Sequence, residues 1–318
     1  MITDEQEKAI VTAEKAVKDN PDNFELHVEL GTVYFHMDQF EKAMTAFQRA
    51  IALNPNATTA FNGIGRVYYH TGPAEAAIDA YERAIALDPH YVDAYYGLGI
   101  LYSAQLGDYG AAVQAFQRGL ERNPTEAFLV ASLGSTYARM GRFEEAIAVL
   151  LQAISLQPDN AFAYNWLSII YLHLKRYDDV IFACQRELEI REEHSARRLL
   201  GYVYDRLDRS NEAISQLERS VALEPQDYEA RGALARVYGI VGRQEEAQEQ
   251  YSIAREMAGQ DNEYGQACFE AVSGNFEQTL KLLEVALTKG QVQPGWVWID
   301  PEFVFMIDDP RFRALIDK

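Results

Sequence analysis

The sequence lacks the segments that would place it in or across a membrane. It has no run of about 20 uninterrupted apolar residues, and its start, MITDEQEKAI, has neither the basic residues nor the apolar stretch of a signal peptide. Cysteines are scarce: Cys184 and Cys268 lie far apart without a CxxC spacing, so we expect both to stay reduced in packed helices. These absences predict a soluble, cytoplasmic protein without membrane insertion.

Basic residues are also in deficit. The chain carries 29 Lys and Arg residues against 48 Asp and Glu, a formal net charge of −19 over 318 residues. Because nucleic acids and anionic membranes attract proteins through clustered positive charge, neither is an expected partner. The share of hydrophobic residues, 48%, is in contrast typical of a folded protein and too high for a disordered one.

Catalytic and cofactor motifs are missing as well. The sequence contains no HExxH, GxSxG or P-loop motif. Gly63-Ile64-Gly65 begins like a dinucleotide-binding loop, but Tyr68 stands where the third glycine belongs and no strand precedes it. The six histidines are spread over the chain. We therefore expect no enzyme activity, no cofactor and no metal site.

What the sequence has instead is a repeat of 34 residues. The segments AIALNP, AIALDP, GLERNP and AISLQP end at prolines spaced 34 or 35 residues apart, and SVALEP follows about two periods later. Halfway between these prolines stands a second motif, L-G-x-x-Y or close to it. Its seven copies begin at Leu30, Ile64, Leu98, Leu133, Leu167, Leu200 and Leu234. Self-similarity of this kind is typical of a repeat architecture.

Each unit is predicted to form two amphipathic helices. The Leu, Gly and Tyr of the first motif fall on one helical face, and the A-x3-F-x2-A spacing of the second half is typical of closely packed antiparallel helices. A glycine in the left-handed conformation is expected to end the first helix. The glycines in this place are Gly72, Gly107, Gly141 and Gly242. In other units the same place is taken by Asp38, Lys175 and Asp208, where we expect less favourable turns.

This pattern resembles the tetratricopeptide-repeat (TPR) family in its period and in its small and large positions. The resemblance implies an all-α fold, a right-handed α-solenoid of antiparallel helix pairs known as the TPR superhelix. We predict a lone N-terminal half-repeat helix at 1–23, seven repeats at 24–259, a degenerate eighth repeat at 260–293 and a C-terminal cap at 294–318.

The tail after residue 293 is too apolar for a free end, since it contains both Trp296 and Trp298. Asp300-Pro301 and Asp309-Pro310 each fit an N-cap followed by proline at the first helical position. We therefore expect two short helices that fold back on the eighth repeat and cover the end of the array. The W…DP…DPRF pattern also resembles the end of bacterial TPR arrays.

Two repeats depart from the common pattern. Repeat five has Glu192 in place of its closing proline, so the run from Cys184 to Arg198 could extend the second helix and form a hinge. Drift in a tolerant repeat is the explanation that we favour, and the hinge is the alternative. Repeat three has one extra residue before Gly107, which predicts a bulge in its first helix.

A candidate binding surface follows from the helical period. At about 100° per residue, positions 2, 5, 9, 12 and 13 of each first helix point away from the packed face, and in the TPR family they line a concave groove. Over the seven repeats these positions carry five arginines against four acidic residues, so the acidic excess lies outside the groove. The groove also has one aromatic residue in each of the first six repeats, and its position 13 is mostly basic or histidine.

These groove residues indicate a peptide or helical segment with apolar anchors and some acidic character, since amides such as Asn62 and Asn165 can bond a peptide backbone. A preference of the scaffold itself for basic residues at position 13 is the alternative explanation of that row. The predicted groove residues are Phe35, His36, Asn62, Arg66, Tyr69, His70, Tyr96, Phe128, Arg139, Phe162, Asn165, His173, Arg198, Tyr202, Arg206 and Arg236.

The predicted function is that of a monomeric protein-interaction scaffold or adaptor that binds other proteins in its concave groove. Two alternatives stay open. One is a self-assembling structural scaffold, whose repeat ends or convex faces stack between copies. The other is a regulatory sensor that responds to a small peptide.

Overall fold

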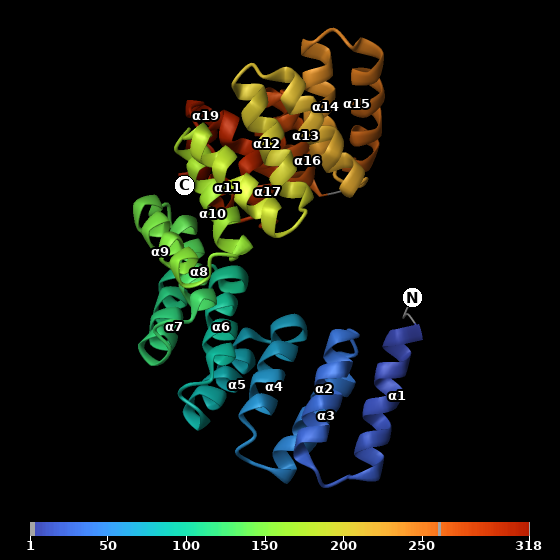
Figure 1. Cartoon of the computed structure of the whole chain (residues 1–318), viewed down its shortest axis with the longest axis vertical. Helices are drawn as coiled ribbons and strands as arrows, with labels where there is room; N and C mark the ends of the chain where they lie inside the picture. The colour runs from blue at the N-terminus through green and yellow to red at the C-terminus, as the bar shows by residue number, and fades with distance from the viewer. Residues whose placement is uncertain (1–3, 260–261, 318) are drawn as a thin grey trace. The chain divides into compact units, whose positions relative to one another are not determined.

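The structure is a computed structural model that describes residues 4–259 and 262–317, without the side chains of residues 304 and 305. Residues 1–3, 260, 261 and 318, which belong to three of the predicted parts, lie outside the described residues. The described chain is built from consecutive helix pairs and contains no strand in those ranges, which confirms the all-α solenoid fold (Figure 1). The chain divides into two compact units, Met1–Thr136 and Tyr137–Lys318.

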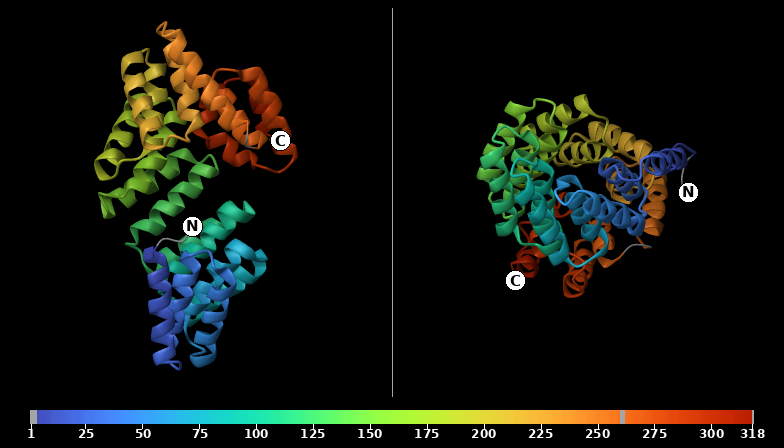
Figure 2. Two further views of the ribbon diagram at one scale, coloured as in Figure 1. Left: turned by 90° about the vertical axis from the view of Figure 1, so that its right-hand side faces the viewer. Right: turned by 90° about the horizontal axis from the view of Figure 1, so that it is seen from below.

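Unit 1 contains three complete helix pairs after a single first helix. Neighbouring helices from α1 to α5 lie side by side in sequence order (Figures 1 and 2). Its elements are α1 (Asp4–Asp19), α2 (Phe24–His36), α3 (Phe40–Leu53), α4 (Thr58–Thr71), α5 (Ala74–Leu87), α6 (Val92–Ile100), the π-helix η1 (Leu101–Leu106), α7 (Tyr109–Arg122) and the larger part of α8 (Ala127–Arg139).

Unit 2 begins at the end of α8 and continues the same alternation up to the tail. Its further elements are α9 (Phe143–Leu156), α10 (Ala161–His173), α11 (Tyr177–Ile190), α12 (His194–Arg206), α13 (Ser210–Leu223), α14 (Tyr228–Ile240), α15 (Gln244–Ala258), α16 (Glu263–Val272), α17 (Phe276–Thr288), α18 (Pro294–Ile299), the 3-10 helix η2 (Pro301–Met306) and α19 (Pro310–Ile316).

The packing of large on small residues explains the repeated motifs. The Phe47 ring of α3 is 2% exposed and lies against Gly31 of α2 and Gly63 of α4. A Cβ atom would come within 2.7 Å of this ring at Gly31 and within 2.5 Å at Gly63. Both positions need glycine because only a missing side chain lets three helices meet around one ring.

The turns between paired helices follow the prediction at all but one glycine. Gly107, Gly141 and Gly242 have φ of 67°, 72° and 82°, in the left-handed region. The prediction for Gly72 is wrong: its φ of −126° and ψ of −174° are extended. Pro73 follows it, and the residue before a proline is driven out of helical geometry towards the extended region.

The two irregular repeats behave differently from each other. In repeat three the extra residue is absorbed by the π-helix η1, which ends at Gly107, so the predicted bulge is confirmed. In repeat five the alternative of an extended second helix is wrong, because α11 ends at Ile190 and Arg191 is extended. Glu192 then binds Arg197 and Arg219, so side chains hold the turn that a proline holds elsewhere.

The tail folds back on unit 2 as expected, but it forms three short elements, α18, η2 and α19, where two were predicted, and it reaches further than the last repeat. Asp300 and Asp309 cap η2 and α19 by accepting hydrogen bonds from the backbone N–H groups of Glu302 and Arg311, which confirms both predicted caps. Here η2 packs on α16 and α19 packs on α17, while α18 and η2 also contact α10. The tail therefore lies against the first helices of several repeats.

Candidate functional site

The concave side of unit 1 holds a hollow of about 390 Å³. It is formed by the first helices α2, α4 and α6, with the beginning of α8. Because these helices share a repeat register, residues far apart in the sequence line the same hollow. The predicted groove residues found here are Phe35, Asn62, Arg66, Tyr69, His70, Tyr96 and Phe128.

Polar groups of this hollow are incompletely paired. Asn62 is 6% exposed, and no described group forms a hydrogen bond with its Oδ1 atom. The Arg66 guanidinium lies 4.1 Å from the centre of the Phe35 ring, and no carboxylate of the described residues comes within 4.0 Å of it. The Asp93 side chain lines the hollow and accepts a hydrogen bond from the Tyr91 hydroxyl. Burial and this carboxylate together raise the pKa of Tyr91 to about 12.

Aromatic rings form the rest of the wall. The exposed imidazole of His70 stacks on the Phe40 ring at 5.3 Å with an angle of 9° between planes, and it meets the Phe35 ring edge-on at 5.5 Å. Tyr96 and Phe128 lie 4.5 Å apart, and Phe128 is 40% exposed. Such rings can take up an apolar side chain from another molecule.

His36 is also exposed and contacts the neighbouring Phe35 ring at 5.7 Å. It is not among the lining residues of the hollow. The structure thus brings seven predicted residues of unit 1 together and leaves His36 beside them.

In unit 2 the chain's own tail occupies the concave side. The Arg139 guanidinium lies 5.5 Å from the Trp166 ring of α10 and 4.7 Å from the Trp296 ring of α18. His173 stacks on Phe143 at 5.4 Å and on Trp298 at 6.0 Å. Burial lowers the pKa of His173 to about 4, although the backbone of Trp298 and Ile299 partly opposes that shift.

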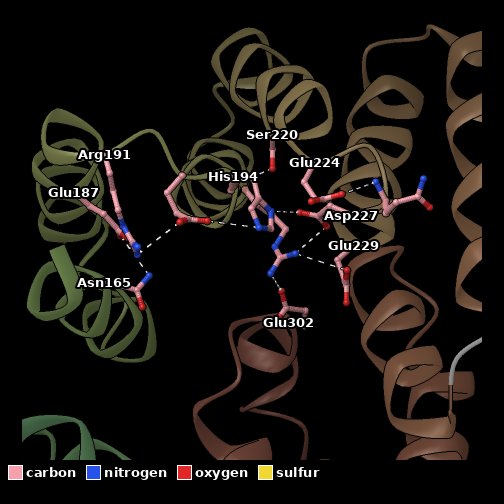
Figure 3. A network of polar contacts seen from close by, with 12 residues as sticks. Asn165, Glu187, Arg191, His194, Ser220, Glu224, Asp227, Glu229 and Glu302 are labelled. Atoms are coloured by element: carbon pink, nitrogen blue, oxygen red, sulfur yellow. Dashed lines mark hydrogen bonds and ion pairs between the residues drawn. The ribbon is translucent and has the colours of Figure 1, made fainter. Parts of the chain in front are cut away.

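An ionic network joins the same surface to η2. Arg198 of α12 lies 2.8 Å from Asp227, 3.7 Å from Glu229 and 3.1 Å from Glu302 of the tail. Figure 3 shows these three carboxylates converging on one point of the network. The Tyr202 hydroxyl donates to Glu302 at 3.4 Å.

The pKa values of the buried carboxylates in this network are shifted in opposite directions. Burial by itself raises the pKa of Asp227, but Arg198 and His194 more than offset burial and hold that pKa well below its usual range. Burial raises the pKa of Glu229 to about 7, despite the nearby charge of Arg198. Burial and the neighbouring Glu302 raise the pKa of Asp300 well above its usual range, and Tyr264 donates a hydrogen bond to Asp300.

The predicted groove residues His173, Arg198 and Tyr202 are thus in contact with the chain's own tail. The same holds for Arg139, whose guanidinium lies against the Trp296 ring. The physical reason is covalent attachment, which keeps the tail at high effective concentration beside the groove. The sequence signal for this contact is the Trp-x-Trp at 296–298 followed by Asp-Pro-Glu, which complements the row of histidine and arginine on the first helices.

The other predicted residues of unit 2 have partners within the chain or lie at the surface. Asn165 donates at 3.3 Å to Glu187, which is fully buried. Arg236 pairs with Asp205 and donates to the Val272 carbonyl at 3.1 Å. Phe162 is 37% exposed and meets the Trp166 ring edge-on, while Arg206 is exposed.

Residues 4–259 and 262–317 contain no group of three or more His, Cys, Asp or Glu side chains placed to hold a metal ion. Both cysteines are free and buried, as expected. Among the helices described here, none is long and apolar enough to cross a membrane.

Two family models match the sequence. The model described as the cilia and flagella-associated protein 70 C-terminal domain matches residues 59–271, and the model described as tetratricopeptide repeat matches residues 22–90. No curated protein matches the sequence.

Solved structures resemble the chain in fold. The structure of the APC/C hetero-tetramer Cut9–Hcn1 matches with a TM-score of 0.62 and 14% identity, covering 86% of this chain and 52% of that one. The type IV pilus biogenesis factor PilW matches with a TM-score of 0.57 and 16% identity, covering 64% and 94%. Pseudomonas aeruginosa pilF matches with a TM-score of 0.56 and 15% identity, covering 64% and 92%.

Proposed function

The chain belongs to the tetratricopeptide-repeat family whose model is described as the cilia and flagella-associated protein 70 C-terminal domain, and from this premise we propose that it is a protein-interaction scaffold. Its binding surface is the concave hollow of unit 1, and its ligand is a segment of a partner protein. Members of this fold family generally bind other proteins. The hollow of about 390 Å³ is large enough for one or two side chains of such a segment.

The observation that carries this proposal is the buried amide of Asn62. Its Oδ1 atom has no hydrogen-bond partner among the described residues, although the side chain lines a ring-walled hollow. Leaving a buried acceptor unpaired costs about 1–3 kcal/mol. A backbone N–H of a bound segment supplies the missing donor, and the surrounding rings of Tyr69 and Tyr96 receive its apolar side chains.

The proposal is tested by site-specific photo-crosslinking in cells that produce the protein. A photoreactive phenylalanine analogue replaces Tyr69 in the hollow or, as the control, Val11 on α1, which is 58% exposed. We expect one recurrent partner segment to be captured at position 69 but not at position 11, and Asn62→Leu to weaken that capture. Equal capture at both positions, or capture that Asn62→Leu leaves unchanged, contradicts the proposal.

A further inference from the structure

We infer that the hollow of unit 1 binds an acidic segment with an aromatic anchor, in which an aromatic ring stacks on His70 and a nearby carboxylate pairs with Arg66. This inference rests on the proposed function, because it specifies the ligand of the same hollow. It goes beyond that function by naming the two side chains that the partner must carry.

The tail of unit 2 supplies the template. His173 is residue 13 of the first helix in its repeat, and it stacks on Phe143, the first residue of the preceding second helix, at 5.4 Å. His70 occupies the same place in its own repeat and stacks on Phe40, the matching residue, at 5.3 Å. The structure thus contains the same imidazole–phenylalanine pair twice.

The two pairs differ in what covers them. A third ring, Trp298 of the tail, stacks on His173 at 6.0 Å with an angle of 20° between planes. His70 is exposed and lines the hollow of unit 1. In unit 2 the corresponding histidine is covered by an aromatic side chain, and ring stacking adds to the burial of apolar area, so the same kind of group suits His70.

Arg66 is the group that calls for a carboxylate beside that ring, because Asp93, which also lines the hollow, does not come within 4.0 Å of its guanidinium. In unit 2 the tail brings Glu302 to Arg198 at 3.1 Å. In unit 1 Arg66 is half-buried over the Phe35 ring and has no carboxylate within 4.0 Å among the described residues. A charge-assisted pair with Asp or Glu satisfies the guanidinium more strongly than a neutral acceptor does.

The geometry of α4 sets the spacing of the segment. Asn62, Arg66 and His70 are four residues apart, so they form a row along one face of the helix. Neighbours in such a row lie about 5–6 Å apart, and an extended chain advances roughly 3.3 Å per residue. The aromatic residue and the acid are therefore one or two residues apart, with a backbone N–H directed at Asn62.

The source of the segment is a partner protein and not the tail of a second copy. The tail is already held within its own chain, where Phe303 and Phe312 are fully buried and Trp298 is stacked on His173. Releasing it exposes these rings to water, which costs about 1.5–3 kcal/mol for each large apolar side chain. A separate acidic segment binds without that loss.

The test uses a fluorescent peptide with the sequence of residues 294–303, PGWVWIDPEF, and the full chain. In this peptide the acid at position 300 follows the ring at position 298 by two residues. The matched control peptide carries Asn and Gln in place of its Asp and Glu. We expect the neutral peptide to bind about tenfold more weakly or worse, as measured by fluorescence anisotropy.

Variants locate the effect. Arg66→Gln should abolish the preference for the acidic peptide, whereas Arg83→Gln should preserve it, because Arg83 is an exposed arginine over the Phe61 ring outside the hollow. Equal affinity for both peptides, or a preference that persists in Arg66→Gln, overturns the inference. A photoreactive residue at Tyr69 distinguishes failure of the acidic specificity from failure of the proposed function. If the neutral peptide binds equally well and crosslinks at position 69, the acidic specificity is wrong and the proposed function still holds.

Discussion

Arg198 of α12 and Glu302 of η2 form an ion pair of 3.1 Å between the concave surface of unit 2 and the tail. The same guanidinium also lies within 4 Å of Asp227 and Glu229. Arg198 therefore balances several buried carboxylates at once, and its loss leaves Glu229 and Glu302 without this counter-charge, while Asp227 keeps only His194. We therefore expect the attachment of the tail to depend more on this buried pair than on an exposed ion pair of the unit.

Replacing Arg198 by methionine is expected to destabilise the docked tail by about 3–5 kcal/mol, because breaking a buried pair leaves an uncompensated charge. Arg219→Gln is the control, since Arg219 is 56% exposed and such pairs contribute up to about 1 kcal/mol. The measurement is urea unfolding followed by tryptophan fluorescence. Trp166, Trp296 and Trp298 all lie at the contact between tail and groove and are the three tryptophans of the chain. Equal effects of the two substitutions contradict the assigned role.

The docked tail is expected to lose stability as the pH falls through the range in which His173 titrates. The pKa of His173 is about 4 in the fold and 6.5 when unperturbed. Below pH 6.5 the unfolded form binds a proton that the folded form does not bind. The loss of stability therefore develops between pH 6.5 and 4 and reaches about 3 kcal/mol. The stability difference between the wild type and His173→Phe should therefore change between pH 7 and 4.5. His90→Phe, at an exposed histidine, should show no such change.

Glu229 is expected to act in the opposite direction. Its pKa is about 7 in the fold against an ordinary 4.5, so it is protonated when folded and ionised when unfolded between these values. Stability from this group is present below pH 4.5 and is lost as the pH rises to 7. Glu229→Gln should therefore stabilise the docked tail by about 1–3 kcal/mol at pH 8 and have little effect at pH 4. Glu245→Gln, at an exposed glutamate, should leave the stability unchanged at both pH values. If Glu245→Gln stabilises the protein at pH 8 as much as Glu229→Gln does, burial of Glu229 is not the cause.

Alanine at Gly63 is expected to destabilise unit 1 by about 1–3 kcal/mol, because its Cβ would lie 2.5 Å from the buried Phe47 ring. Gly239→Ala in α14 is the matched control, since no heavy atom lies within 4 Å of its added Cβ. It should be neutral or should gain about 0.5–1 kcal/mol from helix propensity. Thermal unfolding monitored by circular dichroism compares the two, and a neutral Gly63→Ala refutes the packing argument.

Much of the fold follows from local patterns in the sequence. The repeat period predicts the helix pairs. The one extra residue before Gly107 in repeat three predicts the bulge, which the structure forms as η1. Asp300 and Asp309 could be identified as caps because capping depends on a few adjacent residues. Gly72 was misjudged because the neighbouring Pro73 decides its backbone geometry.

The candidate site was less accessible to sequence reasoning. Helical periodicity places Asn62, Arg66 and His70 on one face, and the structure has them together in the hollow. Periodicity does not say what covers such a face. The pairing of Glu302 with Arg198 joins segments far apart in the chain, and no local preference encodes a contact of that kind.

The π-helix η1 has a consequence for how such a chain can change over generations. Its extra residue is taken up within six residues, Leu101–Leu106, and α7 still begins two residues after the closing glycine at position 107. A single inserted codon at this place therefore leaves the later helices with their buried faces still turned inward. The wider π-helical turn accommodates the inserted residue locally. The array can therefore lengthen by one residue while the packing of the later helices is preserved.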